Sequence, residues 1–197
     1  SIYLGKEGLL PREEMLEVGT KHQELVIGIP KENQDVESRV PLTPEAVEIL
    51  VENGHQVLLE EGAGNSANYP DNQYSENGAM IVEHRKEVLQ ADIILKITPL
   101  SLEDIGLLKE RSIVITSFQV RTHKDKQFIE QLLHKKVTAI SMERIRDEND
   151  CFPLVRSMSS IAGSTAVLIA GEYLSNARNG KGVMLGGITG ITPNEVV

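Results

Sequence analysis

Cysteine and aromatic residues are scarce in this sequence of 197 residues. Cys151 is the single cysteine, so no disulfide can form within the chain and no metal site with several cysteine ligands is available. Tryptophan is absent and aromatic residues make up only 4%, which argues against stacking platforms for single-stranded nucleic acid. We therefore expect a protein of a reducing, cytoplasmic compartment.

Positive charge is also in short supply. Twenty lysines and arginines face 29 acidic residues, which gives a formal net charge of -9. A nucleic-acid-binding domain normally carries a basic patch and a high pI, so the charge argues against that class. A small anionic substrate is still compatible with it, because such a site needs only one or two local cations.

Long apolar runs are lacking as well. Stretches such as Ile93–Leu95 fall far below the roughly 20 residues that cross a bilayer. The start of the sequence shows no basic segment followed by an apolar one, the pattern of a secretory signal. We expect no membrane partner.

The motifs that hold phosphate groups are missing. No G-x-G-x-x-G occurs, and Gly186, Gly187 and Gly190 come nearest with the wrong spacing and no following helix. P-loop, H-E-x-x-H and G-x-S-x-G patterns are also absent. The sequence thus contains no complete cradle for a dinucleotide phosphate.

What the sequence does contain is an alternation of short apolar strands and helices. The predicted strands cover residues 25–29, 56–59, 81–82, 93–97, 113–116 and 137–140, and the predicted helices cover 44–53, 102–108 and 125–134. Thr43 can cap the first of these helices, with Pro44 at its first position. Strands separated by helices predict βαβ units and a parallel sheet. We predict an α/β fold, a doubly wound, mostly parallel open sheet of the flavodoxin/Rossmann-like kind, in a domain spanning residues 25–156.

Segments of different composition flank this domain. Residues 1–24 are predicted to be an N-terminal extension with a short helix beginning near Pro11. Ser159–Leu174 predicts a long helix that Ser157 or Ser159 can cap. A helix that is apolar on most faces is buried or lies between domains. Residues 157–197 would therefore form an interdomain helix, a short strand at 183–185 and the entry to a further domain.

Arg39 is the first candidate site residue. It follows the first predicted strand, and the carboxyl ends of parallel strands form the usual ligand edge of such sheets. Its guanidinium could bind the carboxylate of a 2-oxo or 2-amino acid as a two-pronged fork. The alternative is a surface salt bridge to Glu32 or Glu37.

Three further candidates follow later strands. Lys96 lies in the most apolar strand and could bind a second carboxylate or a carbonyl, or else reach solvent from the sheet edge. Gln119 and His123 follow the next strand, where His123 could act as a general acid or base or belong to a solvated loop. The expected start of the long helix, Met158–Ser160, could bind an anion or be an ordinary cap.

Several linked motifs give the sequence a family resemblance. From about residue 25 to the end, it resembles the alanine dehydrogenase/proton-translocating transhydrogenase α-subunit family, most closely the alanine dehydrogenase branch. The matching segments are Ile27–Glu32, Arg39–Pro44, Gly54–Val57, Glu61–Gly64, Asp92–Lys96, Ser157–Gly163 and Met184–Gly190. The resemblance implies a substrate domain, an interdomain helix and then a Rossmann domain whose G-x-G-x-x-G would follow Val197. It also implies a homo-oligomer, often a hexamer.

The same resemblance assigns roles to individual positions. The family's substrate-carboxylate arginine falls on Arg39, and a residue near the cofactor falls on Ser159, with Met158 beside it. The family's substrate lysine falls on Thr98 and its catalytic histidine at or near Gln119, so this chain departs from the pattern at both positions. Lys96 and His123 are the candidates to replace them, and the catalytic aspartate would lie beyond Val197.

These assignments imply an NAD-dependent alanine dehydrogenase. It would convert L-alanine, NAD and water to pyruvate, ammonia and NADH, and the chain alone would be inactive without its cofactor domain. The departures at Thr98 and Gln119 keep two alternatives open. One is the NAD-binding subunit of a transhydrogenase, and the other is a non-catalytic, carboxylate-binding homologue.

Overall fold

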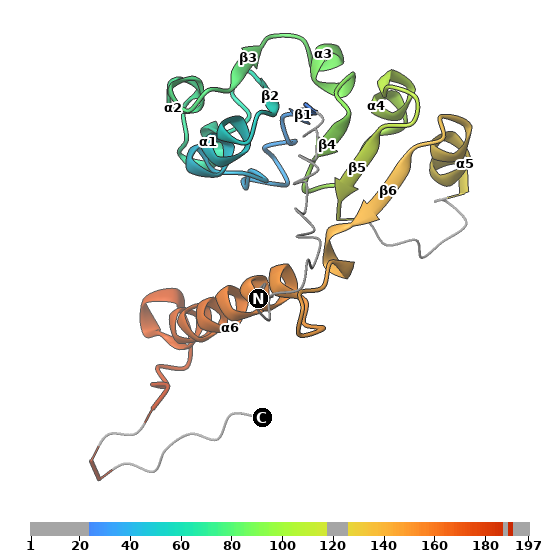
Figure 1. Cartoon of the computed structure of the whole chain (residues 1–197). Helices are drawn as coiled ribbons and strands as arrows, with labels where there is room; N and C mark the ends of the chain where they lie inside the picture. Colours follow the sequence, from blue (N-terminus) through green and yellow to red (C-terminus); the bar gives the residue numbers. More distant parts are fainter. Residues whose placement is uncertain (1–23, 118–125, 187–188, 191–197) are drawn as a thin grey trace, which may run out of the picture.

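The computed structural model describes residues 24–117, 126–186 and 189–190 (Figure 1). Within these residues one parallel sheet has the strand order β3-β2-β1-β4-β5-β6. Its strands are β1 (Val26–Ile29), β2 (Gln56–Glu60), β3 (Met80–Val82), β4 (Ile93–Leu95), β5 (Ile113–Thr116) and β6 (Thr138–Ser141). This order defines a doubly wound α/β sheet and confirms the predicted fold class.

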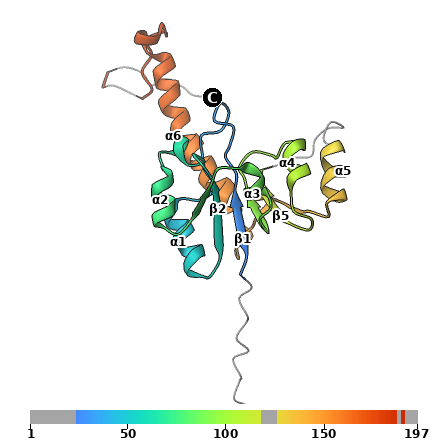
Figure 2. The same cartoon turned by 90° about the horizontal axis from the view of Figure 1, so that it is seen from above.

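Helices cover both faces of the sheet. They are α1 (Pro44–Glu52), α2 (Asp71–Glu76), α3 (Arg85–Leu89), α4 (Leu102–Leu107) and α5 (Lys126–His134). Helix α6 (Pro153–Leu174) lies apart from the sheet, and short 3-10 turns are η1 (Asn65–Ala67), η3 (Met142–Arg144) and η4 (Asn176–Arg178). One apolar core joins α1 and α2 to β1 and β2, and a second joins α3, α4 and α5 to β4 and β5. Figure 2 shows α1 and α2 at one side of the sheet and α4 and α5 at the other. The chain adds strands in one direction from β1 to β3 and in the other from β4 to β6, so the winding reverses between β1 and β4. Because the crossovers are right-handed, the helices of the two halves lie on opposite faces of the sheet.

Gly28 shows how closely the layers pack. A Cβ atom at this position of β1 would lie 2.3 Å from the backbone oxygen of Val88 and 3.0 Å from the Ala91 Cβ. The end of α3 thus rests directly on the backbone of β1, and only glycine leaves room for it. This contact fixes the helix that carries the chain across to β4.

Most predicted elements are confirmed, but several need correction. Thr43 accepts a hydrogen bond from the Ala46 amide at 3.4 Å and caps α1 as predicted. Strand β4 ends at Leu95 rather than Ile97, because the Ile97 amide turns away to a side-chain carboxylate. The short helices α2 and α3 were not predicted, and residues 183–185 form no strand. Instead, the Val183 amide donates to the Leu174 carbonyl at the end of α6.

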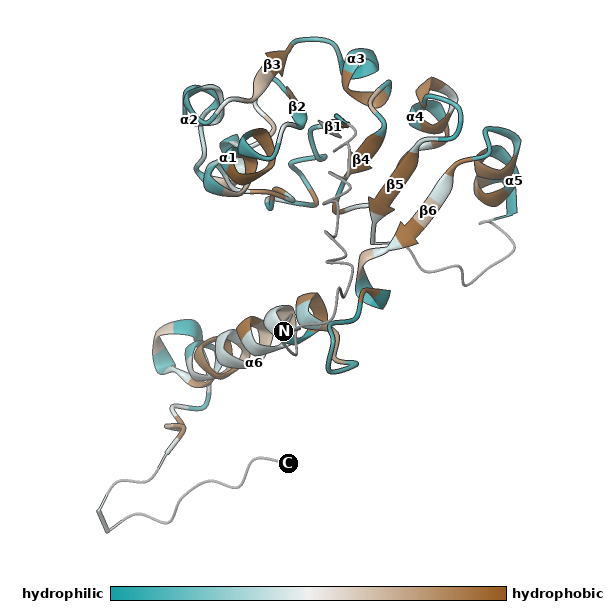
Figure 3. Cartoon of the chain, in the orientation of Figure 1, coloured by the Kyte–Doolittle hydropathy of each residue, from teal (hydrophilic) through white to brown (hydrophobic). Residues whose placement is uncertain are grey.

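Helix α6 begins earlier than predicted and runs without a break. It starts at Pro153 rather than Ser159, because proline suits a first helical position and Phe152 before it is not helical, with φ -98° and ψ 89°. It continues through Gly163 and Gly171 and has no buried residue. Figure 3 shows apolar residues along this helix, set apart from the sheet. The predicted helix near Pro11 lies outside the described residues.

By length and composition alone, α6 could cross a membrane, with a mean hydropathy of 1.3 over an 18-residue window. The sequence-based expectation counted only uninterrupted apolar runs and missed this, because Ala, Gly and Ser interleave with the large apolar residues of α6. A single such helix is weak evidence, since a helix that docks between domains has a similar composition. The absence of a membrane partner stays a prediction.

Candidate functional site at the carboxyl edge of the sheet

The candidate site lies where β1 and β4 end side by side. The winding of the sheet reverses between these two strands, and ligands of open α/β sheets bind in the crevice outside such a switch point. Glu32 follows β1 and Lys96 follows β4, and both side chains belong to buried residues, 6% and 4% exposed. The topology thus places one acid and one base at the centre of the edge.

Glu32 connects the ends of both strands. Its carboxylate forms an ion pair with Lys96 Nζ and accepts hydrogen bonds from the Ile97 amide at 2.5 Å and from Thr98 Oγ1 at 2.5 Å. Lys96 also donates to Thr98 Oγ1. A buried ion pair is tolerated only when its remaining hydrogen-bonding groups are satisfied, which this network achieves. Lys96 is therefore a fixed buried cation, and the alternative of an edge lysine that reaches solvent is wrong.

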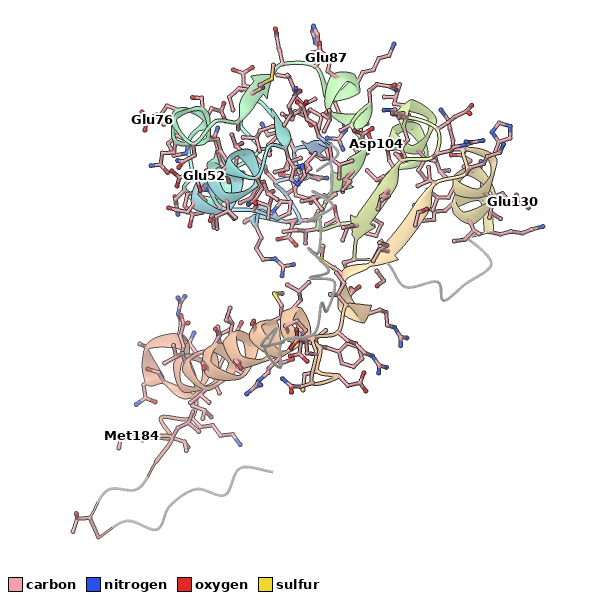
Figure 4. All side chains as sticks on the ribbon, in the orientation of Figure 1. Glu52, Glu76, Glu87, Asp104, Glu130 and Met184 are labelled. Carbon is pink, nitrogen blue, oxygen red and sulfur yellow. The ribbon has the colours of Figure 1, made fainter. Side chains whose placement is uncertain are left out.

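Arg85 joins the starts of α3 and α4 next to the Glu32–Lys96 pair, and this arrangement is called the arginine clamp. Arg85 at the start of α3 binds Asp104 through two hydrogen bonds, at 2.7 and 2.8 Å, and Glu60 at 2.9 Å. It also donates to the backbone oxygen of Lys31 at 2.9 Å, next to Glu32. Burial opposes the charged form of Asp104, but the hydrogen bonds from Arg85 hold the pKa of its carboxyl below the ordinary value. Figure 4 labels Asp104 at this end of the sheet domain.

A pocket of about 350 Å³ opens beside the network. Its lining combines the two strand ends with the start of α4, and consists of Asn33, Arg85, Lys96, Thr98, Pro99, Ser101, Glu103 and Asp104. Lys96 and Thr98, both predicted site residues, therefore meet at one polar cavity.

Arg39 lies in the loop between β1 and α1 and faces two neighbours. Its Nε and Nη2 atoms donate to the two carboxylate oxygens of Glu37 at 2.7 and 2.6 Å, and its Nη1 atom lies 2.9 Å from the Met158 sulfur on α6. The predicted alternative of a salt bridge to Glu37 is thus present. The structure also brings Arg39 and Met158, both predicted site residues, into contact.

The Glu32 carboxylate and the Arg39 guanidinium interact electrostatically. The hydrogen bond from Arg39 to Glu37 raises the pKa of the guanidinium most strongly, and the Glu32 carboxylate adds to this effect. Tyr74 secures the same loop, because its hydroxyl donates to the Leu42 carbonyl at 2.8 Å. Burial raises the pKa of Tyr74 to about 12, so this hydroxyl keeps its proton.

The remaining predicted residues are placed differently. Ser159 lies on exposed α6, one residue beyond Met158. Met158–Ser160 are not the start of the helix, because α6 begins at Pro153, so the predicted anion site at a helix start is wrong there. Ser157 is likewise no cap, and its hydroxyl donates to the Pro153 carbonyl at 3.0 Å. Gln119 and His123 lie outside the described residues.

Sequence reasoning missed four acidic or basic groups at this edge. Glu32 and Glu37 appeared only as alternative partners of Arg39, and Arg85 was not considered. Their signal was available in part, since Glu32 and Lys96 carry opposite charge just after two strongly apolar strands. Glu143 was also missed; it accepts hydrogen bonds from Ser117 and from Ser141, the latter at 2.5 Å, and ties β5 to β6.

The described residues do not form a dinucleotide site by themselves. In a dinucleotide-binding sheet, the first strand leads through a tight glycine-rich turn to a helix whose free amides hold the pyrophosphate. Here residues 30–43 form a long connection, and the Thr43 side chain already caps α1. The sheet shares the strand order of nucleotide-binding domains without their phosphate cradle.

Comparison with known families agrees with this arrangement. Residues 28–162 match the model of the family described as alanine dehydrogenase/PNT, N-terminal domain. The match covers the sheet, Arg39, Lys96 and the first half of α6. The chain belongs to this family.

Individual relatives support the same placement. The chain is 37% identical to an alanine dehydrogenase of Methanococcus maripaludis over 88% of its own length and 46% of the relative's. A solved L-alanine dehydrogenase superposes with a TM-score of 0.77 at 32% identity, covering 86% of this chain and 46% of that one. A transhydrogenase from Sinorhizobium meliloti superposes with a TM-score of 0.56 at 27% identity over 63% of this chain. The chain therefore spans just under half the length of the alanine dehydrogenases it matches.

Proposed function

We propose that this chain forms the substrate-side domain of an NAD-dependent alanine dehydrogenase. The reaction would convert L-alanine, NAD and water to pyruvate, ammonia and NADH. The observation that carries the proposal is the position of Arg39, beside the switch point of the sheet and next to the buried Glu32–Lys96 pair. A carboxylate bound to Arg39 would place the rest of a small 2-amino or 2-oxo acid near these groups.

Each candidate residue has a distinct role in this proposal. Arg39 holds the substrate carboxylate through charge-assisted hydrogen bonds. Thr98 contacts the substrate, and Lys96 acts through it, since Lys96 Nζ donates to Thr98 Oγ1. Gln119 takes the position of the catalytic group after β5. Ser159 and Met158 on α6 face the cofactor side.

NAD would accept the hydride, and we place its binding chiefly outside this chain, because the described residues form no phosphate cradle. We assign residues 25–156 to the substrate domain and 157–197 to the interdomain segment. The exposed apolar surface of α6 supports the division at residue 156. Such a surface is unfavourable in water and is typical of a helix that another domain or subunit covers. We further propose a cytoplasmic homo-oligomer, with a hexamer as its form.

The higher identity and wider structural overlap with alanine dehydrogenases favour this function over a transhydrogenase subunit. The decisive experiment follows NADH formation by the complete gene product with L-alanine and with a panel of other amino acids. Arg39→Ala should lower kcat/KM for alanine about a hundredfold, the value of a lost charge-assisted contact of roughly 2–3 kcal/mol. Arg178→Ala, which breaks an exposed pair with Glu172, is the matched control and should leave kcat/KM unchanged.

Turnover restricted to other amino acids would keep the dehydrogenase class and change the substrate. A protein that binds NADH and turns over no amino acid would contradict the proposal. Hydride exchange between two nicotinamide cofactors would then identify a transhydrogenase subunit. Carboxylate binding lost in Arg39→Ala, without any turnover, would identify a non-catalytic homologue.

A further inference from the structure

The contact between Arg39 and Glu37 has a definite orientation. A guanidinium presents a side-on edge, formed by Nε and one terminal nitrogen, and an end-on edge, formed by the two terminal nitrogens. Glu37 occupies the side-on edge, because its oxygens accept from Nε and Nη2. The Glu37 side chain also accepts a hydrogen bond from the Arg39 amide at 2.9 Å. Two hydrogen bonds thus hold this edge of the guanidinium on Glu37, and the third joins the Glu37 carboxylate to the Arg39 backbone.

The end-on edge is held much less firmly. Its Nη1 atom faces the thioether sulfur of Met158, a weak acceptor that a carboxylate oxygen can replace at little cost. Arg39 as a whole is only half-buried, with 48% of its side chain exposed, whereas the Glu37 side chain is 11% exposed. The acid is therefore the more buried partner, and the guanidinium is the more exposed one.

We propose that Glu37 is a positioning residue that holds the side-on edge of Arg39 and leaves the end-on edge, facing α6, for a single substrate carboxylate. This inference rests on the proposed function and adds to it the direction from which the carboxylate binds. It would enter between the loop that carries Arg39 and the segment of α6 around Met158. Glu37 itself would not touch the substrate.

The expected effect falls on binding rather than on the chemical step. A free arginine side chain samples many rotamers, and ordering it on binding lowers affinity by up to about tenfold. Glu37 orders the Arg39 side chain before the substrate binds, so removing the Glu37 carboxylate should raise the KM for the carboxylate substrate. The reacting carbon lies away from the carboxylate fork, so kcat should change little.

The test uses the complete gene product in the direction of pyruvate amination. Glu37→Ala should raise the KM for pyruvate about tenfold and leave kcat within about threefold. Glu37→Gln keeps one acceptor oxygen and should give an intermediate rise in KM. Asp35→Asn is the matched control, since it removes a negative charge from the same exposed loop without touching Arg39, and should leave both constants unchanged.

Calorimetric titration of pyruvate in the presence of NADH and without ammonia separates this inference from the proposed function, because it needs no turnover. Weaker pyruvate binding in Glu37→Ala than in the parent protein supports the positioning role. Equal or tighter binding, or a fall in kcat at constant KM, would overturn it while leaving the dehydrogenase assignment intact. A parent protein that binds no pyruvate would overturn both proposals.

Discussion

The parallel sheet and α6 differ in what covers their apolar residues. In the sheet, side chains such as Ile29, Leu59 and Ile94 are fully buried between helices of the same chain. In α6, Ile161, Val167 and Leu168 are exposed, and the helix has no buried residue. Both regions carry large apolar side chains, and they differ in what packs against these side chains.

This difference separates two sources of stability. The sheet domain stabilises itself, because its cores and its buried Glu32–Lys96 pair are complete within the described residues. Helix α6 buries no residue within the described part of the chain and makes few side-chain contacts there, such as that of Met158 with Arg39. It therefore lacks most of the tertiary packing that stabilises helices in proteins. Substitutions should therefore affect global unfolding in the sheet and only local order in α6.

The largest expected effect comes from breaking the buried pair. Lys96→Met leaves Glu32 buried without its cation and should lower the free energy of unfolding by about 3–5 kcal/mol. Arg178→Met breaks the exposed pair between η4 and α6 and should produce no measurable change. Urea unfolding of this chain, followed by circular dichroism, measures both. Equal effects of the two substitutions would contradict the contrast between the regions.

A pair of leucines provides the next test. Leu59→Ala opens a cavity in a complete core and should lower the free energy of unfolding by about 2–4 kcal/mol. Leu168 is 74% exposed, so Leu168→Ala should have no global effect in this chain. If α6 is covered by another domain or subunit in the complete protein, Leu168→Ala should destabilise that protein. Equal insensitivity in both contexts would show that α6 stays uncovered.

The carboxylate of Asp104 gives a smaller, pH-dependent contribution. Its pKa is lower in the folded state, so its stabilisation is present above the ordinary pKa of an aspartate and is lost as the pH falls through the folded-state value. Between pH 7 and pH 3, the loss of stability should therefore be smaller in Asp104→Asn than in the parent protein. Glu172→Gln on α6 controls for the removed charge. An unchanged pH profile in Asp104→Asn would show that the clamp to Arg85 contributes nothing to acid sensitivity.

Local signals in the sequence were enough to predict most of the sheet. The Thr43–Pro44 cap and the apolar strands are set by neighbouring residues, and the structure confirms them. Helices α2 and α3 are too short to show a helical period. The start of α6 was misplaced because serine hydroxyls and Pro153 offer competing start signals, and the sequence alone does not decide between them.

The site was harder to predict, because its geometry depends on contacts between strands. Arg39 could be found from its position after β1, and its pairing with Glu37 was one of the two stated alternatives. Glu32 could not be assigned, since its hydrogen bond to the Ile97 amide exists only after β1 and β4 become neighbours. That same bond ends β4 early. The contacts of Glu32 therefore depend on which strands become neighbours, and the spacing of residues in the sequence does not predict them.

The same substitution, glycine to alanine, should have opposite signs in the two regions. Gly163→Ala adds a methyl group where nothing lies within 4 Å, so it should strengthen α6 by about 1 kcal/mol through helix propensity. Gly28→Ala adds the same group 2.3 Å from the Val88 oxygen and should destabilise the sheet by about 1–3 kcal/mol. Amide hydrogen exchange resolves both, because it reports α6 and β1 separately. Slower exchange confined to α6 in Gly163→Ala would confirm that α6 is ordered by itself, whereas faster exchange there would mean that another surface packs against Gly163.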